Sequence, residues 1–293
     1  MARSMLIRDF AREYYLPHVL VNTTTGRSRY AIFKNHIEPN FGALNFRDLS
    51  RIKIHDWRNS LIIRGYKPAM INKIQVIFGQ IIDLAKDLSV NHDIDRSYLG
   101  FRTLRVIPHH DTCLSANQMD RLRSECKKSS NKNLFHIVIL LALTGARKRE
   151  ILDARWCDID LEKRIILVPK SKNGFSRRVF LNDGALTIIN SCKLTKNPNG
   201  YVFTNPKTGK PYSCIYHSWN LARKNADLPS LRIHDLRHSF ASALVNQGIS
   251  IYDVQHLLGH QSIKTTQRYA HLNDQTLLKS AHSAHQYYSQ DRQ

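Results

Sequence analysis

The sequence predicts a mainly helical protein of two domains, with a small antiparallel β-hairpin or sheet inside the second, mixed α/β domain. Apolar residues recur at helical spacing along most of the 293 residues, and a polar, irregular stretch divides the chain near residues 91–112. A chain of this length can bury two separate cores. We therefore expect a helical domain over residues 1–105, a linker to about residue 112, and a second domain over 113–293.

Apolar residues of the first domain follow the periodicity of α-helices. One pattern runs from Ile32 to Ile37 and stops before Pro39, where the helix is expected to end. A second pattern is broken at Gly65, and a longer apolar face begins at Ile71. Together they predict a small helical bundle over about residues 1–90.

The second domain is expected to open with a helix that Ser115 caps. The apolar run from Leu134 to Leu143 predicts a buried helix that ends at Thr144 and Gly145. Two strand-like segments then flank Asn-Gly, the strongest short hairpin signal. The expected strands are 164–168 and 177–181, and the later helices are Ile215 to Ala226, His234 to Asn246, Tyr252 to Leu258, and a last one capped by Ser262 that runs through Tyr269.

The charge of the chain indicates a polyanionic partner. Lys and Arg total 44 against 23 Asp and Glu, a net charge of +21, with +8 in residues 1–110 and +13 in residues 111–293. Such widely distributed positive charge suits a protein that holds nucleic acid from two sides. Five cysteines without a C-x-x-C pair, no signal-peptide pattern and no long apolar run predict a cytoplasmic protein without a membrane partner.

Phosphodiester cleavage without a metal needs a nucleophile, cations for the non-bridging oxygens and an acid for the leaving oxygen. Arg147 follows the end of a buried helix, where its planar guanidinium could bind two phosphate oxygens. His234 and Arg237 share a helix face at i, i+3 spacing. Tyr269 stands nine residues after His260. Each residue taken alone also suits an ordinary surface or core position.

The predicted hairpin carries a cluster of basic residues. Lys172 stands at its tip and is a candidate proton donor, with Lys170 as its rival. These lysines, together with Arg177 and Arg178, could equally be solvated charges that only touch phosphates. Arg223 and Lys224, on the helix expected over residues 215–226, are further candidate DNA-binding residues.

Three sequence boxes resemble those of the tyrosine recombinases, also called phage integrases. They are TGARKREIL around Arg147, IHDLRHSFAS around His234 and Arg237, and LLGHQS followed by Tyr269. The segment SKNG also resembles the lysine-bearing hairpin of that family, and the order of the boxes agrees. The resemblance covers about residues 113–285. It departs where the family often has proline in the second hairpin strand, because this chain has Phe180-Leu181, which leaves the choice between the two hairpin lysines open.

The resemblance implies a role for each matching residue. Arg147 and Arg237 would hold the scissile phosphate, and His234 and His260 would hydrogen-bond it, with one of them helping to deprotonate the tyrosine. Glu150 would orient neighbouring groups and Tyr269 would form a 3′-phosphotyrosyl link. The sixth catalytic group, Lys172, would protonate the departing 5′ oxygen.

At the level of the whole protein, the resemblance implies a site-specific recombinase that works through a Holliday junction, without metal or nucleotide cofactor. The expected partners are duplex DNA with specific sites, three further copies of the chain in a cyclic tetramer, and an accessory directionality protein. Apolar residues at helical spacing in the segment 274–293 suggest a docking helix. A type IB topoisomerase, a DNA-binding protein without catalysis, and a metal site near His109, His110 and Cys113 are the alternatives considered.

Overall fold

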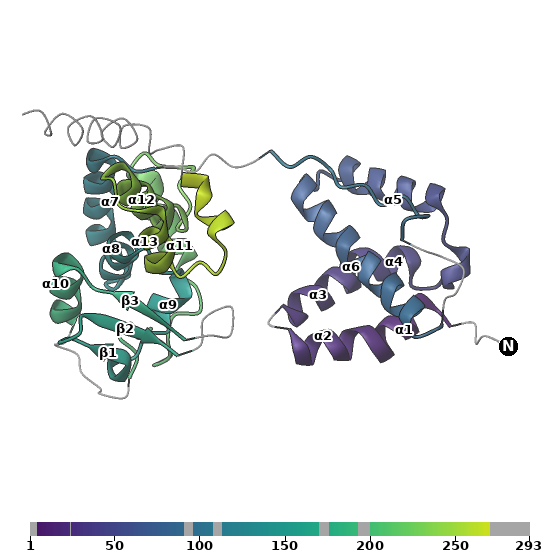
Figure 1. The fold of residues 1–293 in the computed structure, drawn as a ribbon, viewed down its shortest axis with the longest axis horizontal. Helices are drawn as coiled ribbons and strands as arrows, with labels where there is room; N and C mark the ends of the chain where they lie inside the picture. The colour runs from purple at the N-terminus through teal and green to yellow at the C-terminus, as the bar shows by residue number, and fades with distance from the viewer. Residues whose placement is uncertain are drawn as a thin grey trace, which may run out of the picture. The chain divides into compact units, whose positions relative to one another are not determined.

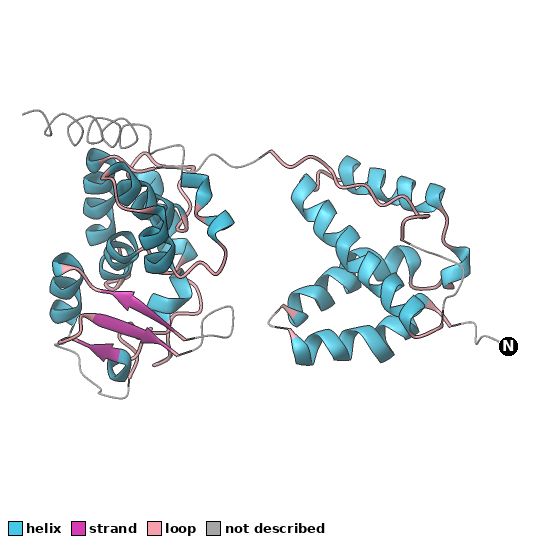
Figure 2. Ribbon diagram, viewed as in Figure 1, coloured by secondary structure: helices cyan, strands magenta, loops and turns pink. Residues whose placement is uncertain are grey.

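The computed structural model divides the chain into two compact units, residues 1–109 and residues 110–293. It describes residues 5–23, 25–90, 96–107, 113–169, 176–192 and 200–269. The described residues form helices and one three-stranded sheet, which confirms the predicted fold class (Figure 2). The hairpin tip with Lys170 and Lys172, the histidines of the linker and the C-terminal segment 274–293 lie outside the described residues.

The first unit is a helical bundle, as predicted. Helix α6 (Pro68–Asp87) runs through its middle and contacts α3 and α5 (Figure 1). Phe41, Trp57 and Phe78 form an aromatic cluster at its core, with ring centroids 4.7–5.7 Å apart. The elements before α6 are α1 (Ile7–Phe10), the π-helical turn η1 (Ala11–Tyr15), α2 (Leu16–Asn22), α3 (Gly26–Ile32), the π-helical turn η2 (Phe33–Ile37), α4 (Glu38–Phe41), the 3₁₀ turn η3 (Phe46–Asp48) and α5 (Arg51–Ile63).

Two details of the first unit differ from the sequence prediction. The helical segment was expected to stop before Pro39, but the chain stays helical through α4, as far as Phe41. Pro39 is tolerated because it lies in the first turn of α4, directly after η2, where its missing N–H removes little. The described residues 96–107, after α6, form no helix, yet Leu99 is fully buried in the core of this unit.

The second unit is built around α8 (Leu134–Thr144), whose residues Ile137, Val138 and Leu140 are fully buried. Ser115 caps α7 (Ala116–Lys128) through a capping box with Gln118, as the sequence predicts. The remaining elements are α9 (Lys148–Leu152), the 3₁₀ turn η4 (Trp156–Asp158), β1 (Ile159–Asp160), β2 (Ile165–Val168), β3 (Arg177–Phe180), α10 (Asp183–Cys192), α11 (Tyr216–Asn225), α12 (Asp235–Asn246), α13 (Ile251–Leu258) and the 3₁₀ turn η6 (Ile263–Thr265).

The sheet has the order β1-β2-β3, and both pairs of neighbours are antiparallel (Figure 1). The hairpin register pairs Ile166 with Val179, and both side chains are buried. Because side chains alternate across a strand, the next pair, Leu167 and Arg178, faces outward and is exposed. Strand β1 and helix α10 were not predicted from the sequence.

Glycines end two helices that the functional site uses. Gly145 closes α8 and Gly259 closes α13, and both adopt a left-handed conformation, with φ of 61° and 65°. A side chain at Gly145 would also overlap the Phe240 ring of α12. The carbonyls of Gly145 and Leu258, at these two helix ends, both accept hydrogen bonds from Arg237 of α12.

The segment that leads to Tyr269 differs from the prediction. A helix capped by the Ser262 side chain was expected, but that side chain makes no capping bond, and 3₁₀ turns take the place of an α-helix. Backbone bonds join Thr266 to Ile263 and Tyr269 to Thr266, which is the i to i+3 pattern. Two β-branched threonines at 265 and 266 also weaken the preference for an α-helix.

None of the described helices is both long and apolar enough to cross a bilayer.

Candidate active site

Arg237 is the most deeply buried cation of the site, with 3% of its surface exposed. Its guanidinium donates from Nη1 to the Gly145 carbonyl and from Nη2 to the Leu258 carbonyl, both at 2.7 Å. These carbonyls end α8 and α13, where helix dipoles place negative charge that stabilises a cation. Burial, followed by the charge of Arg147, lowers the pKa of Arg237 below its usual value. Two helix ends therefore hold this arginine in one orientation before any substrate binds.

Arg147 begins α9 and is partly exposed. Its Nη1 donates to Glu150 Oε1 at 2.9 Å, and its Nη2 donates to the Gly259 carbonyl at 3.3 Å. The Glu150 carboxylate also accepts the Arg147 backbone N–H at 2.7 Å, which completes a capping box. The sequence resemblance implies an orienting role for Glu150, and this contact is the one through which it holds Arg147.

Arg177 occupies a position that the sequence did not predict. It was expected on the exposed face of a hairpin, but only 10% of its side chain is exposed. Its Nε and Nη2 bind both oxygens of Glu150 at 2.9 and 2.8 Å, and its Nη1 donates to the Leu257 carbonyl at 3.2 Å. A Cβ at Gly259 would lie 2.5 Å from Nη1, and the positive φ of this residue also favours glycine there. Arg177 thus joins β3, α9 and the end of α13.

Glu150 lies between the two arginines and is buried. Burial alone would raise the pKa of its carboxyl group, but hydrogen bonds and charge from Arg177, with further bonds from Arg147, hold that pKa below its usual value. A buried carboxylate with several charge-assisted bonds is fixed in place. Glu150 therefore orients both arginines, which agrees with the supporting role that the sequence resemblance implies for it.

His260 follows Gly259 and faces the same group of arginines. Burial, followed by the charges of Arg237, Arg147 and Arg177, lowers the pKa of His260 to about 4. The imidazole is therefore neutral near pH 7. Its Nδ1 is 2.8 Å from the hydroxyl of Thr266, which is fully buried. This contact fixes the ring.

His234 is the exposed N-cap of α12. Partial burial, followed by the charge of Arg237, lowers the pKa of His234. The next residue, Asp235, is fully buried and accepts the Arg232 backbone N–H at 2.7 Å, which fixes the first turn of the helix. His234 and Arg237 therefore both lie at the start of α12, where their i, i+3 spacing places them on one face.

Tyr269 is buried, with 3% of its surface exposed, in a small apolar cluster with Val254 and Leu258 of α13 and residues of α12. Its hydroxyl is hydrogen-bonded to Nδ1 of His238. His238 was part of a predicted sequence box, but no role was assigned to it. Its spacing of four residues from His234 on the same helix is the signal that could have identified it.

Three other predicted DNA-binding residues are described by the structure. Arg178 is exposed on β3, and Lys224 is exposed on α11. Arg223 donates to the carbonyls of Pro229 and Leu231, so its guanidinium closes the loop after α11. The contacts of these residues with DNA stay predictions, as do those of the two hairpin lysines.

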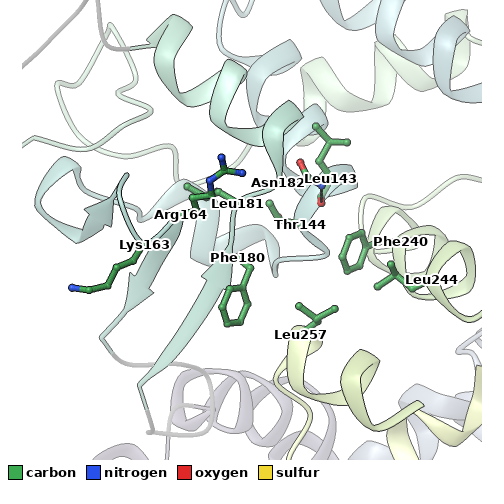
Figure 3. Close-up of a pocket in the computed structure, with 10 residues that line it drawn as sticks. All are labelled: Leu143, Thr144, Lys163, Arg164, Phe180, Leu181, Asn182, Phe240, Leu244 and Leu257. Atoms are coloured by element: carbon green, nitrogen blue, oxygen red, sulfur yellow. Dashed lines mark hydrogen bonds between the residues drawn. The ribbon is translucent and has the colours of Figure 1, made fainter. Parts of the chain in front are cut away.

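A groove of about 410 Å³ lies on the same unit, but it is apolar (Figure 3). Phe180, Phe240 and Leu257 face it, while Lys163 and Arg164 stand at one side. None of its ten lining residues is a predicted catalytic residue. The candidate active site is therefore the polar cluster around Arg237, and not this groove.

Chemically, the cluster is suited to a tetrahedral anion. Arg147 and Arg177 bind the Glu150 carboxylate, and Arg237 is held nearby by two helix-end carbonyls. Two histidines with lowered pKa values, His234 and His260, and the Tyr269 hydroxyl complete the set. Within the described ranges, no three His, Cys, Asp or Glu side chains lie close enough to hold a metal ion.

Residues 112–276 match the model of the phage integrase family, and residues 10–62 match its N-terminal SAM-like domain. The chain belongs to the phage integrase family. The first match contains each residue of the polar cluster, from Arg147 to Tyr269. The family assignment therefore agrees with the resemblance that the three sequence boxes carry.

One curated relative is the tyrosine recombinase XerA of Saccharolobus solfataricus, which is 35% identical over 53% of this chain and 50% of its own length. The chain spans about half the length of the first curated relatives it matches.

Two solved structures share the fold. The Tn1549 transposon integrase, in complex with a circular intermediate DNA, has a TM-score of 0.76 at 16% identity and covers 91% of this chain and 95% of that one. A lambda integrase tetramer bound to a Holliday junction has a TM-score of 0.72 at 18% identity and covers 91% and 78%.

Proposed function

We propose that this member of the phage integrase family is a site-specific DNA recombinase that uses Tyr269 as its nucleophile. The observation that carries the proposal is the buried Arg237, held by two helix ends within the cluster that contains Arg147, His260 and the tyrosine. Preorganised cations of this kind stabilise the charge that develops on a phosphoryl group during displacement.

The proposed reaction exchanges one phosphodiester for another. The Tyr269 oxygen attacks phosphorus and bonds to it, while the bond from phosphorus to the 5′ oxygen breaks. The phosphorus stays bonded to the 3′ oxygen of the strand, so the product is a 3′-phosphotyrosyl link. Arg147 and Arg237 hold the non-bridging oxygens, and His234 and His260 hydrogen-bond the phosphate. The reverse attack by a 5′ hydroxyl releases the tyrosine, and no nucleotide is consumed because the bond type is conserved.

The 5′ oxygen needs a proton as it leaves. Lys172 is the proposed donor, and Lys170 is its rival. A DNA substrate with sulfur in place of the 5′ bridging oxygen distinguishes them, since a thiolate leaves without a proton. The variant of the true donor should cleave this substrate at close to the wild-type rate, whereas the other variant should show no selective rescue.

The helical first unit is proposed to hold duplex DNA together with the catalytic unit. Its match to an N-terminal SAM-like domain and the net charge of +8 over residues 1–110 support this role. The Tn1549 integrase, which shares the fold, is described in complex with DNA.

A cyclic tetramer on two DNA sites is proposed as the working assembly. A lambda integrase of the same fold is described as a tetramer on a Holliday junction. The apolar spacing in segment 274–293 favours a docking role for it. Deleting residues 275–293 should leave strand cleavage intact and abolish pairing of sites; unimpaired recombination by the truncated protein would refute the role.

The decisive experiment uses a nicked DNA half-site that traps the covalent product. Wild-type protein should form an adduct that resists denaturant, and the Tyr269→Phe protein should bind the same DNA without forming it. Absence of an adduct with wild-type protein would favour a DNA-binding protein without catalysis. Relaxation of plasmids that lack any recombination site would favour a topoisomerase.

A further inference from the structure

We infer that His238 is the catalytic base that removes the proton from the Tyr269 hydroxyl and returns it during religation. This inference rests on the proposed function and adds a residue to it. The histidines expected to assist the tyrosine were His234 and His260, yet the imidazole that contacts the phenol oxygen is that of His238, through Nδ1. A general base must lie within hydrogen-bond reach of the proton it removes.

His238 is held firmly in this position. It is buried on α12, directly after Arg237 and one helical turn beyond His234. Its ring meets the ring of His234 edge to face, with centroids 5.0 Å apart and planes at 88°. A phenol that donates to Nδ1 leaves the imidazole proton on Nε2, so the neutral ring is ready to accept a second proton at Nδ1.

The two other histidines of the site are less suited to this step. His260 has its Nδ1 bound to the Thr266 hydroxyl, and its low pKa makes it a weak base. His234 is exposed at the start of α12, a position from which it can reach a bound phosphate. The structure therefore divides the work, with His234 and His260 for the phosphate and His238 for the nucleophile.

The burial of Tyr269 makes a protein base necessary. Only 3% of its surface is exposed, and apolar side chains of α12 and α13 pack around it. Bulk water therefore has little access to the hydroxyl, which favours transfer of the proton to a group already in contact. Among the described residues, His238 makes such a contact.

Proton transfer accompanies the attack on phosphorus. The Tyr269 proton moves to Nδ1 of His238 while the phenol oxygen bonds to phosphorus, and the departing 5′ oxygen takes a proton from a lysine. His238 becomes an imidazolium close to Arg237, which is unfavourable until the negative phosphate offsets the added charge. Proton removal is thus coupled to DNA binding. During religation the imidazolium returns its proton to the tyrosine oxygen.

Single-turnover cleavage of the half-site tests the inference. His238→Ala should slow cleavage by about 10²- to 10⁴-fold, the usual contribution of a general base. His238→Asn can accept a hydrogen bond near the position of Nδ1 but cannot take the proton, so it should be nearly as slow. His217→Asn, at an exposed histidine of α11, is the control and should keep the wild-type rate.

Chemical rescue separates a base from a structural residue. Added imidazole should accelerate His238→Ala, and among imidazoles of similar size the rate should rise with the pKa of the added base. DNA affinity and circular dichroism of both variants should match those of the wild type. The small change to asparagine provides a second folded variant if alanine in this buried position disrupts the helix.

Three results would overturn the inference: cleavage by His238→Ala within threefold of the wild type, a wild-type rate for His238→Asn, or a slow alanine variant that no imidazole accelerates. Its failure differs from failure of the proposed function. If the proposed function fails, the wild-type protein forms no adduct at all. If only the inference about His238 fails, the wild-type protein still forms the adduct and Tyr269→Phe still abolishes it.

Discussion

The two units of the chain bury different kinds of side chain. In the first unit, the buried side chains among the described residues are apolar apart from Arg58 and Gln75. The second unit buries the ionisable side chains of Glu150, Asp235 and Arg237. A buried charge is costly unless it is paired, so charges persist in a core where fixed partners surround them. The buried polar groups of the second unit therefore depend on specific partners, whereas the core of the first unit depends mainly on apolar packing.

The partners of these charges come from distant parts of the chain. Arg237 is held by carbonyls at the ends of α8 and α13, and Glu150 is held by arginines at the start of α9 and on β3. Fixed donors need little reorganisation when charge develops on a substrate. We therefore expect substitutions in the second unit to affect chemistry first, and substitutions in the first unit to affect stability first.

The largest expected effect follows from removing the buried guanidinium. Arg237→Met should reduce single-turnover cleavage at least about 10²- to 10³-fold, the usual loss for one electrostatic donor, because methionine fills the space without charge. Arg237→Lys should recover little of this rate. The two guanidinium nitrogens of Arg237 each bind a different carbonyl at 2.7 Å, and a single ammonium nitrogen cannot take both positions. Arg123→Met, at an exposed residue of α7, is the control. Near-normal cleavage by Arg237→Met would contradict this account of the site.

A core substitution in the first unit should act differently. Phe78→Ala removes the fully buried ring that contacts Phe41 and Trp57, and it should destabilise this unit by about 3–5 kcal/mol. Denaturant titration measures the effect. Val76→Ala lies on the exposed face of the same helix and should change stability by less than about 0.5 kcal/mol. Equal effects from the two substitutions would show that the apolar core does not dominate here.

Two adjacent arginines of β3 provide an internal test. Arg177→Met should destabilise the second unit by about 2–3 kcal/mol and slow cleavage, because Glu150 loses two charge-assisted bonds. Arg178→Met should leave stability unchanged, because its side chain is exposed. If Arg178 contacts a phosphate, its substitution should weaken DNA binding. The slope of log affinity against log salt concentration should then fall by about one, because one fewer counterion is released.

The Arg177 prediction fails if both variants have wild-type stability, or if Arg177→Met changes DNA affinity alone. Thermal unfolding, DNA binding at several salt concentrations and the cleavage rate at saturating DNA separate these outcomes.

Local sequence signals predicted much of the fold. The capping box at Ser115 and the left-handed glycines 145 and 259 mark helix ends through contacts a few residues away. The helix through Pro39 could not be predicted in this way. The π-helical turn η2 ends just before it, so the proline lies in the first turn of α4 and not in the middle of a helix. The 3₁₀ turns before Tyr269 likewise depart from the expected helix: the tyrosine packs against α12 and α13, and buried Thr266 is bonded to His260.

The structure brings together several residues that the sequence singled out, through contacts that the sequence did not predict. Recurrent motifs identified Arg147, Arg237 and Tyr269, whereas the partners of Arg177 and His238 depend on tertiary packing. A strand turns alternate residues to opposite faces, so only the register distinguishes the buried Arg177 from the exposed Arg178. No local pattern in the sequence determines that register.

The smallest effect expected is a change in titration without loss of the fold. Free of DNA, His260 should titrate near pH 4, because burial and the charges of Arg237 and Arg147 disfavour its protonated form. Its unfolded value is about 6.5, so the unfolded chain binds more protons between these values. The stability that neutral His260 contributes is therefore complete above about pH 6.5 and is lost as the pH falls toward 4.

A bound phosphate should offset the arginine charges and raise the pKa of His260 toward its ordinary value. NMR titration of the imidazole resonances measures this pKa with and without half-site DNA. The Tyr269→Phe protein is used in both samples so that the DNA is not cleaved, and His260→Gln assigns the resonance. A pKa near 6.5 in the free protein would mean that the arginines do not act on His260. An unchanged low value on DNA would mean that the phosphate does not enter this cluster.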